Sequence, residues 1–166
     1  MPEKTADTRL ISDFDDFLQN VPAFAEFGQE EIAMLEKAMS VEEFPDGYEF
    51  IGEDQRGESM FLIIDGEVVA THRRSQIRGR DMIERLGPGD LFGLVALIDH
   101  RPTWATYRAK GRVIAASLPT NAFRLLFTAD APLGHHFQSL IAVQLVRDLR
   151  ACAHALMRVF ADKQAS

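Results

Sequence analysis

Histidine and cysteine are the side chains of this 166-residue chain that metal binding or nucleophilic catalysis would use first. The chain contains five histidines and one cysteine, namely His72, His100, His135, His136, His154 and Cys152. His135 and His136 are neighbours in a helical pattern, so their side chains diverge by about 100° and cannot converge on one metal ion. Cys152 lies on an apolar stripe, where a buried, unreactive thiol is expected. We therefore predict no metal, no catalytic residue and no enzyme activity.

Residues 87–105 contain the types that an anion-binding loop needs. A turn of glycine, proline and aspartate at 87–90 leads into Phe92 and Gly93, and a short helix beginning at Gly93 presents free backbone N–H groups at its positive end. Arg101 follows as a cation able to pair with phosphate. A single loop arginine is usually solvated. We interpret Arg101 and the neighbouring His100 in this way, with anion binding by Arg101 as the alternative.

The overall composition excludes several classes of protein. Eighteen lysines and arginines against 25 aspartates and glutamates give a net charge of −7, which repels a nucleic-acid backbone. A single cysteine allows no intrachain disulfide, and no apolar run approaches the ~20 residues that cross a bilayer. The first seven residues lack the basic and apolar regions of a secretion signal. We expect a cytoplasmic protein that contacts neither DNA nor a membrane.

The hydrophobic period divides the chain into three zones. Apolar residues recur at steps of three and four over about 9–40 and again over about 120–162, which predicts helices at both ends. Over about 41–118, short apolar runs alternate with turn residues, which predicts short antiparallel strands. One of these turns, Asp65-Gly66, predicts a hairpin. We expect one mostly β domain over 1–166 with flanking helices, the last of them long.

The spacing of the turn glycines resembles that of cyclic nucleotide-binding domains. Residues 44–51 place a glycine three positions after an apolar residue, and residues 57–68 contain a glycine, an acid, a small residue and an apolar strand that ends in glycine. Residues 87–93 contain glycine-aspartate before Phe-Gly. Each glycine marks a turn that a Cβ would strain. The resemblance implies that family's β-roll, a double-stranded β-helix or jelly roll, and a regulatory function.

Residues 92–105 match the ligand cassette of that family in spacing but not in charge. The family's glutamate, which accepts from the ribose hydroxyl, is Leu94 here, and its arginine, which pairs with the cyclic phosphate, is Thr103. Losing two charge-assisted contacts of about 1.5–3 kcal/mol each weakens binding roughly 100- to 10,000-fold. The resemblance implies these candidate ligand-binding residues: Phe92, Gly93, Leu94, Val95, Ala96, Arg101, Thr103, Trp104 and Ala105.

Trp104 occupies a position where the family has a small residue. An indole stacks readily on a nucleotide base, and it also fills space that a ligand would otherwise occupy. It would face away from the pocket if it alternates with Thr103 along an extended backbone. We interpret this single tryptophan as packing that plugs the pocket or joins the core. Base stacking and an outward orientation are the alternatives.

These residues predict a stand-alone regulatory or sensor module with weak or absent binding of cAMP and cGMP. The alternative is a genuine cyclic nucleotide-binding protein that uses Arg101 and the helix N-terminus at Gly93. A remote alternative is a cupin-like metalloenzyme, since cupins are also β-rolls, but a cupin site needs a His-x-His pair that the sequence lacks. We expect no cofactor, a cyclic nucleotide being the ligand only in the alternative.

The last helical zone predicts the surface through which such a module acts. An apolar stripe at steps of three and four includes Phe137, Ile141, Leu145, Leu149, Cys152 and Leu156. In bacterial activators of the family that the chain resembles, the equivalent helix forms a dimer seam. We therefore expect a homodimer, with packing on the chain's own sheet as the alternative. No DNA-binding unit is expected after this helix, so the output should pass to an unidentified effector protein.

Overall fold

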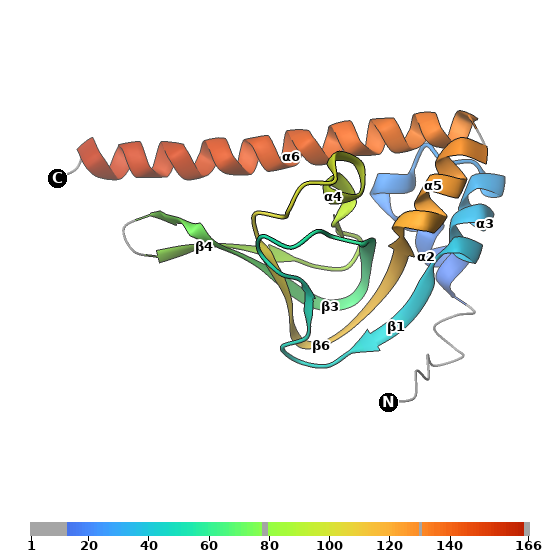
Figure 1. Ribbon diagram of the computed structural model, residues 1–166, viewed down its shortest axis with the longest axis horizontal. Helices are drawn as coiled ribbons and strands as arrows, with labels where there is room; N and C mark the ends of the chain where they lie inside the picture. The colour runs from blue at the N-terminus through green and yellow to red at the C-terminus, as the bar shows by residue number, and fades with distance from the viewer. Residues whose placement is uncertain (1–12, 78–79, 130, 165–166) are drawn as a thin grey trace.

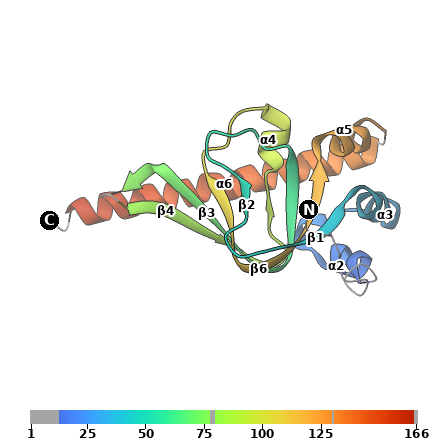
Figure 2. The same ribbon diagram turned by 60° about the horizontal axis from the view of Figure 1, so that its bottom comes forward.

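The computed structural model describes residues 13–77, 80–129 and 131–164. Figures 1 and 2 show a twisted sheet with α2, α3 and α5 gathered at one end and α6 running along one side and beyond the sheet. The helices are α2 (Phe14–Asn20), the 3-10 helix η1 (Pro22–Phe24), α3 (Gln29–Ala38), α4 (Leu94–Asp99), α5 (Thr120–Ala129) and α6 (Ala131–Gln164). The strands are β1 (Ser40–Phe44), β2 (Glu49–Ile51), β3 (Ser59–Ile77), β4 (Arg80–Leu86), β5 (Leu91–Phe92) and β6 (Thr106–Pro119).

The described strands form one antiparallel sheet in the order β1-β6-β3-β4, with β2 paired to β6 and β5 paired to β3. Its centre is the pair β3–β6, whose register runs from Ser59 opposite Pro119 to Thr71 opposite Thr106. The mostly β fold with helices at both ends is confirmed. The predicted helical zone about 9–40 holds α2, η1 and α3, and its residues 9–12 lie outside the described residues.

The hairpin predicted at Asp65-Gly66 is wrong. Strand β3 continues through both residues, and the ladder to β6 shifts register between Ile63 and Asp65 and again before Glu67. Gly66 has a φ of +95°, and a Cβ there would lie 2.5 Å from the carbonyl oxygen of Arg112. The glycine therefore permits a bulge that bends one long strand, instead of a turn that ends it.

The helices pack against one end of the sheet, and the contact between them forms a hydrophobic core. Side chains buried there come from α2, α3, β3, α4, β6 and α6 and include Leu18, Leu35, Met60, Leu62, Leu94, Leu118, Leu133 and Phe137. Ile32 and Leu35 of α3 and Met39, which directly follows it, are buried in the same core. Glu31 joins two of these helices, because it accepts from the Gly28 N–H at 2.6 Å and from His136 Nδ1 of α6 at 3.0 Å.

The long helix α6 is buried only over its first turns. Leu133 and Phe137 are inaccessible to solvent and Leu140 nearly so. Beyond them, the predicted stripe becomes exposed: Leu145 is 48%, Leu149 70% and Leu156 57% accessible. The side chain of Cys152 lies outside the described residues. Intramolecular packing therefore accounts for the first part of the stripe alone. Among the described residues, no helix combines the length and apolarity needed to cross a membrane.

Candidate functional site

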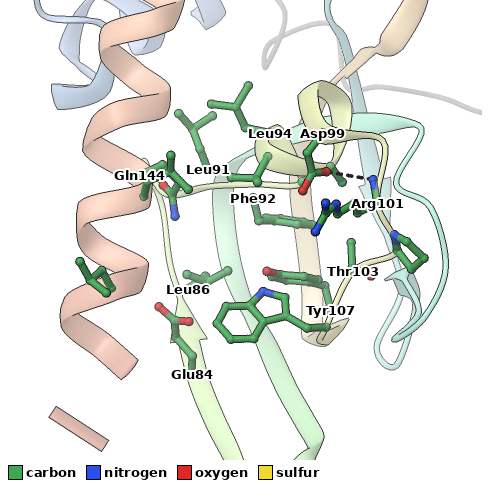
Figure 3. Close-up of a pocket in the computed structure, with 17 residues that line it drawn as sticks. Glu84, Leu86, Leu91, Phe92, Leu94, Asp99, Arg101, Thr103, Tyr107 and Gln144 are labelled. Carbon is green, nitrogen blue, oxygen red and sulfur yellow. Dashed lines mark hydrogen bonds between the residues drawn. The ribbon is translucent and has the colours of Figure 1, made fainter. Parts of the chain in front are cut away.

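A cavity of about 490 Å³ lies between the segment 93–104, strand β4 and helix α6 (Figure 3). This volume falls in the usual range for small-molecule pockets. Eight of the nine predicted cassette residues line it: Phe92, Gly93, Leu94, Val95, Ala96, Arg101, Thr103 and Trp104. The ninth, Ala105, is fully buried and is not part of the lining. That these residues bind a ligand stays a prediction.

Gly93 lines the cavity and is the N-cap residue of α4. Its φ is +82°, and a Cβ there would lie 2.6 Å from the carbonyl oxygen of Ser59. Only glycine fits such a close approach at positive φ. The backbone can then turn from β5 into α4, which packs Leu94 and Leu97 into the core.

Leu94 belongs to the core more than to the cavity. Its side chain is 1% exposed and lies in the same buried cluster as Leu62 and Leu133. Leu94 could offer a ligand only an apolar contact, and a sugar hydroxyl placed there would lose its hydrogen bond to water without a replacement. Leu94 therefore offers no polar atom for a ribose hydroxyl.

The polar groups of Thr103 form hydrogen bonds that hold the fold together. Its hydroxyl donates to the carbonyl oxygens of Gly52 at 2.8 Å and Gln55 at 3.2 Å. Its backbone N–H donates to Gln55 O at 2.8 Å, and its own carbonyl accepts from the Asp54 N–H at 2.7 Å. Thr103 is 9% exposed. It fastens the cassette to the loop between β2 and β3 and carries no positive charge for an anion.

Among the described residues that line this cavity, Arg101 is the one cation. Its backbone N–H donates to Asp99 Oδ1 at 3.0 Å, which fixes the loop that follows α4. Figure 3 shows its side chain pointing into the cavity toward Phe92. The interpretation of Arg101 as a solvated loop residue is therefore incomplete, because this exposed side chain also faces the candidate ligand space.

Trp104 neither plugs the pocket nor joins the core, so that interpretation is wrong. Its side chain is 55% exposed and forms one wall of a cavity that remains open. The Trp104 carbonyl accepts a hydrogen bond from His72 Nδ1 at 3.2 Å, and the two rings meet edge to face with centroids 5.1 Å apart. Contact with buried His72 of β3 holds the backbone of Trp104 while most of the indole stays accessible.

Several lining residues were missed by sequence reasoning because other elements bring them to the cavity. Tyr107 comes from β6 and stacks on Phe92 with centroids 5.0 Å apart and an interplanar angle of 11°. Glu84 and Leu86 come from β4, and Gln144 comes from α6. Leu145 and Leu149, which were predicted for a dimer seam, also line the cavity. An aromatic three residues after Trp104 was the only local signal, and the others depend on tertiary packing.

Residues 41–130 match the protein-family model described as "Cyclic nucleotide-binding domain". Over 124 residues the chain is 31% identical to a cAMP-dependent protein kinase regulatory subunit of Debaryomyces hansenii. The matched region covers 75% of this chain and 26% of that protein. The chain spans about a quarter of the length of the curated relatives that it matches.

Three solved structures share the fold. The regulatory domain of Toxoplasma gondii protein kinase A, crystallised with cAMP, superposes with a TM-score of 0.70 at 24% identity, covering 84% of this chain and 51% of that one. A Trypanosoma brucei regulatory subunit, described as belonging to a cAMP-independent protein kinase A, gives 0.62 at 26% identity, covering 70% and 43%. A triple variant of the latter, bound to cAMP in its A site, gives 0.68 at 25%, covering 81% and 47%.

Proposed function

This chain belongs to the cyclic nucleotide-binding domain family, and from this premise we propose that it is a regulatory module with weak or absent affinity for cAMP and cGMP. The observation that carries the proposal is the hydrogen bonding of Thr103, whose hydroxyl donates to two backbone carbonyls at the position where a phosphate-pairing arginine is expected. Leu94 adds to the loss, because it is buried in the core. The two missing contacts amount to about 3–6 kcal/mol.

The Trypanosoma brucei structures support this reading of Thr103. The triple variant that holds cAMP changes a glutamate to alanine, a threonine to arginine seven residues later, and the next valine to alanine. Ala96, Thr103 and Trp104 have the same spacing in this chain. On this comparison the chain already has the alanine and lacks the arginine, so a single substitution at Thr103 addresses the missing phosphate contact.

Calorimetric titration of the full chain with cAMP tests the proposal. We expect a dissociation constant above about 100 μM for the native sequence. Thr103→Arg should tighten it about 10- to 100-fold, since one charge-assisted pair is regained. Thr128→Arg on exposed α5 adds the same charge away from the cavity and should change nothing. A native dissociation constant below about 10 μM would contradict the proposal, provided that the thermal midpoint confirms folding of each variant.

A second candidate function is genuine cyclic nucleotide binding through Arg101 and the backbone at Gly93. The orientation of the Arg101 side chain into the cavity favours it. In that case Arg101→Ala should abolish cAMP binding that the native protein shows. Arg124→Ala, on α5 outside the cavity lining, is the matched control and should retain it.

The output of the module is proposed to pass through α6 to a second copy or to an effector protein. The relatives are regulatory subunits, which supports a regulatory role without catalysis. Helix α6 exposes large apolar side chains that the other described residues leave uncovered: Val143, Leu145, Val146, Leu149, Leu156, Met157 and Phe160. Exposed apolar side chains that gather along one helix are typical of a protein contact. Among the described residues, no group of His, Cys, Asp and Glu side chains is arranged to hold a metal.

A further inference from the structure

The exposed part of α6 carries an apolar stripe with the spacing of a coiled coil. Six exposed residues, which we call the distal seam, recur at alternating steps of four and three: Ala142, Val146, Leu149, Ala153, Leu156 and Phe160. This spacing keeps one stripe facing a second helix along its length. At about 100° per residue, the distal seam lies roughly 170° around α6 from Leu133, Phe137 and Leu140, which are buried in the core. The helix therefore has two separate apolar faces, and its own domain covers one of them.

The distal seam is large enough for a stable contact between two proteins. Its four large side chains are 46–70% exposed, and three neighbours on its flanks are exposed to a similar degree: Val143, Leu145 and Met157. At roughly 100 Å² of accessible surface for each of these side chains, two copies would cover roughly 1,400 Å² in total. Stable interfaces bury about 1,200–2,000 Å². A second copy of the helix is therefore sufficient to account for the whole face.

The order of residues in the distal seam is complementary to itself when the second helix runs in the opposite direction. An antiparallel pair centred on residue 151 forms three kinds of layer, each occurring twice: Ala142 against Phe160, Val146 against Leu156, and Leu149 against Ala153. Two of these layers combine a small side chain with a large one. Facing positions that combine large and small residues fill the space between helices without voids or strain.

A parallel pair would pack the same seam less evenly. Each layer would then contain one residue twice, so that Phe160 meets Phe160 while Ala142 and Ala153 each meet another alanine. The phenylalanine layer would be crowded and the alanine layers would leave gaps at the same separation of the helices. The dipoles of two parallel helices also oppose this arrangement, whereas antiparallel dipoles attract.

We propose that the distal seam binds a second copy of this chain, with the two α6 helices antiparallel and crossing at residue 151. This inference rests on the proposed function, because it takes α6 as the element that transmits the output, and it adds the partner, its direction and its register. Leu149 also lines the candidate cavity. The interface is therefore continuous with the wall that α6 contributes to that cavity.

Cysteine cross-linking of the full chain tests the direction of the pair. Val146→Cys and Leu156→Cys, each combined with Cys152→Ser and each with a tag of different mass, are oxidised separately and as a mixture. A disulfide needs Cα atoms within about 7 Å, and the antiparallel register separates two copies of residue 146 by about 15 Å along the helix. We expect a cross-linked dimer in the mixture and none from either variant alone. Leu125→Cys, on exposed α5, is the control and should cross-link with neither. Cross-linking of each variant with itself would show a parallel pair and overturn the inference.

Exchanging a large and a small residue tests the register. Phe160→Ala should raise the dissociation constant of the dimer by about 10-fold or more, since it removes the large side chain from two layers. Adding Ala142→Phe to the same chain should restore the constant to within about threefold. Neither residue belongs to the core of the domain, so the thermal midpoint should stay unchanged.

Three results of these measurements would overturn the inference: no rescue by the double variant, a native dimer without the mixed cross-link, or a native chain that stays monomeric at 100 μM in light scattering. None of them changes the affinity for cAMP, which calorimetry measures on the same chain. A dissociation constant of cAMP below about 10 μM would contradict the proposed function whatever the direction of the helices. The two failures are therefore distinguishable.

Discussion

The hydroxyl oxygen of Thr103 lies 2.8 Å from the carbonyl oxygen of Gly52 and donates a hydrogen bond to it. Gly52 belongs to the loop that leaves β2, and Thr103 belongs to the cassette 51 residues later. The bond is buried and is supported by backbone bonds of the same two segments. A residue at the expected phosphate-binding position therefore shapes the pocket wall, and we expect its substitution to affect stability.

Replacing this hydroxyl should cost stability. Thr103→Val keeps the branched shape but removes the hydroxyl donor from the buried Gly52 carbonyl, while Gln55 O keeps the backbone N–H of residue 103, and we expect a loss of about 1–2 kcal/mol in the free energy of unfolding. Thr103→Ser should retain most of it. Thr128→Val removes a hydroxyl that bonds at the exposed surface of α5 and should stay within about 0.5 kcal/mol of the native value. Urea denaturation measures all three, and equal losses at 103 and 128 would contradict the structural role.

Gly93→Ala should be severe. A Cβ at φ +82° would meet the Ser59 carbonyl oxygen at 2.6 Å, and neither backbone segment can move without disturbing β5 or β3. We expect a loss of about 2–4 kcal/mol. Gly87→Ala is the matched control, since a Cβ there has no atom within 4 Å and its φ is not in the left-handed region. Thermal unfolding should separate the two variants clearly, and similar midpoints would show that the turn at Gly93 is adaptable.

The fold was predictable because short local patterns in the sequence determine its turns. Gly93 is needed because a Cβ there would lie 2.6 Å from the Ser59 carbonyl oxygen, so a glycine at this point of the sequence carries information about the turn. The turn signal at Asp65-Gly66 failed for a physical reason: a glycine at positive φ permits a hairpin or a bulge, and the contact with Arg112 of β6 decides between them. That contact is 46 residues away in sequence and cannot be inferred from the dipeptide.

The sequence predicted which cassette residues line the cavity, but not how their side chains are oriented. The spacing of the cassette placed Leu94 and Thr103 correctly on one cavity. The packing of Leu94 in the core and the hydrogen bonds of Thr103 to the loop between β2 and β3 depend on partners from other elements. The accessibility of Trp104 likewise follows from the position of His72 on β3. Gln144 reaches the cavity through the packing of α6, for which the sequence around the cassette holds no signal.

Glu31 should be a stabilising link between α3 and α6. It is buried and accepts from both Gly28 N and His136 Nδ1, so Glu31→Ala leaves two donors without an acceptor and should cost about 1.5–3 kcal/mol. Glu30→Ala, in the same first turn but exposed, is the matched control and should cost below about 0.5 kcal/mol. A double-mutant cycle with His136→Ala measures the direct coupling. Strict additivity of the two losses would refute the link.

Glu67 should give the stability a dependence on acid pH. A hydrogen bond from Lys110 lowers the pKa of the Glu67 carboxyl below its ordinary value of 4.5, partly opposed by burial and aided by the charges of Lys110 and Arg85. Because the folded pKa is the lower one, the stabilisation is present above the ordinary value and is lost as the pH falls through the folded pKa. Glu67→Gln should therefore be less stable than the native chain at pH 7 and equal to it at pH 2, measured by urea midpoints. A difference that persists at pH 2 would contradict this cause.

The exposed part of α6 should determine the oligomeric state. Met157 and Phe160 are 70% and 61% exposed on a helix that continues past the sheet (Figure 1), and the other described residues leave both side chains uncovered. Burying such side chains against a second helix is favourable by roughly 25 cal/mol per Å² of apolar surface, so we expect a dimer by light scattering at micromolar concentration. Met157→Glu with Phe160→Glu should give a monomer with an unchanged thermal midpoint of the fold, because neither side chain belongs to the core cluster. Leu125→Glu, equally exposed but on α5, should leave the dimer intact. A native chain that stays monomeric at 100 μM would instead leave this apolar face to a different effector protein and would refute the dimer.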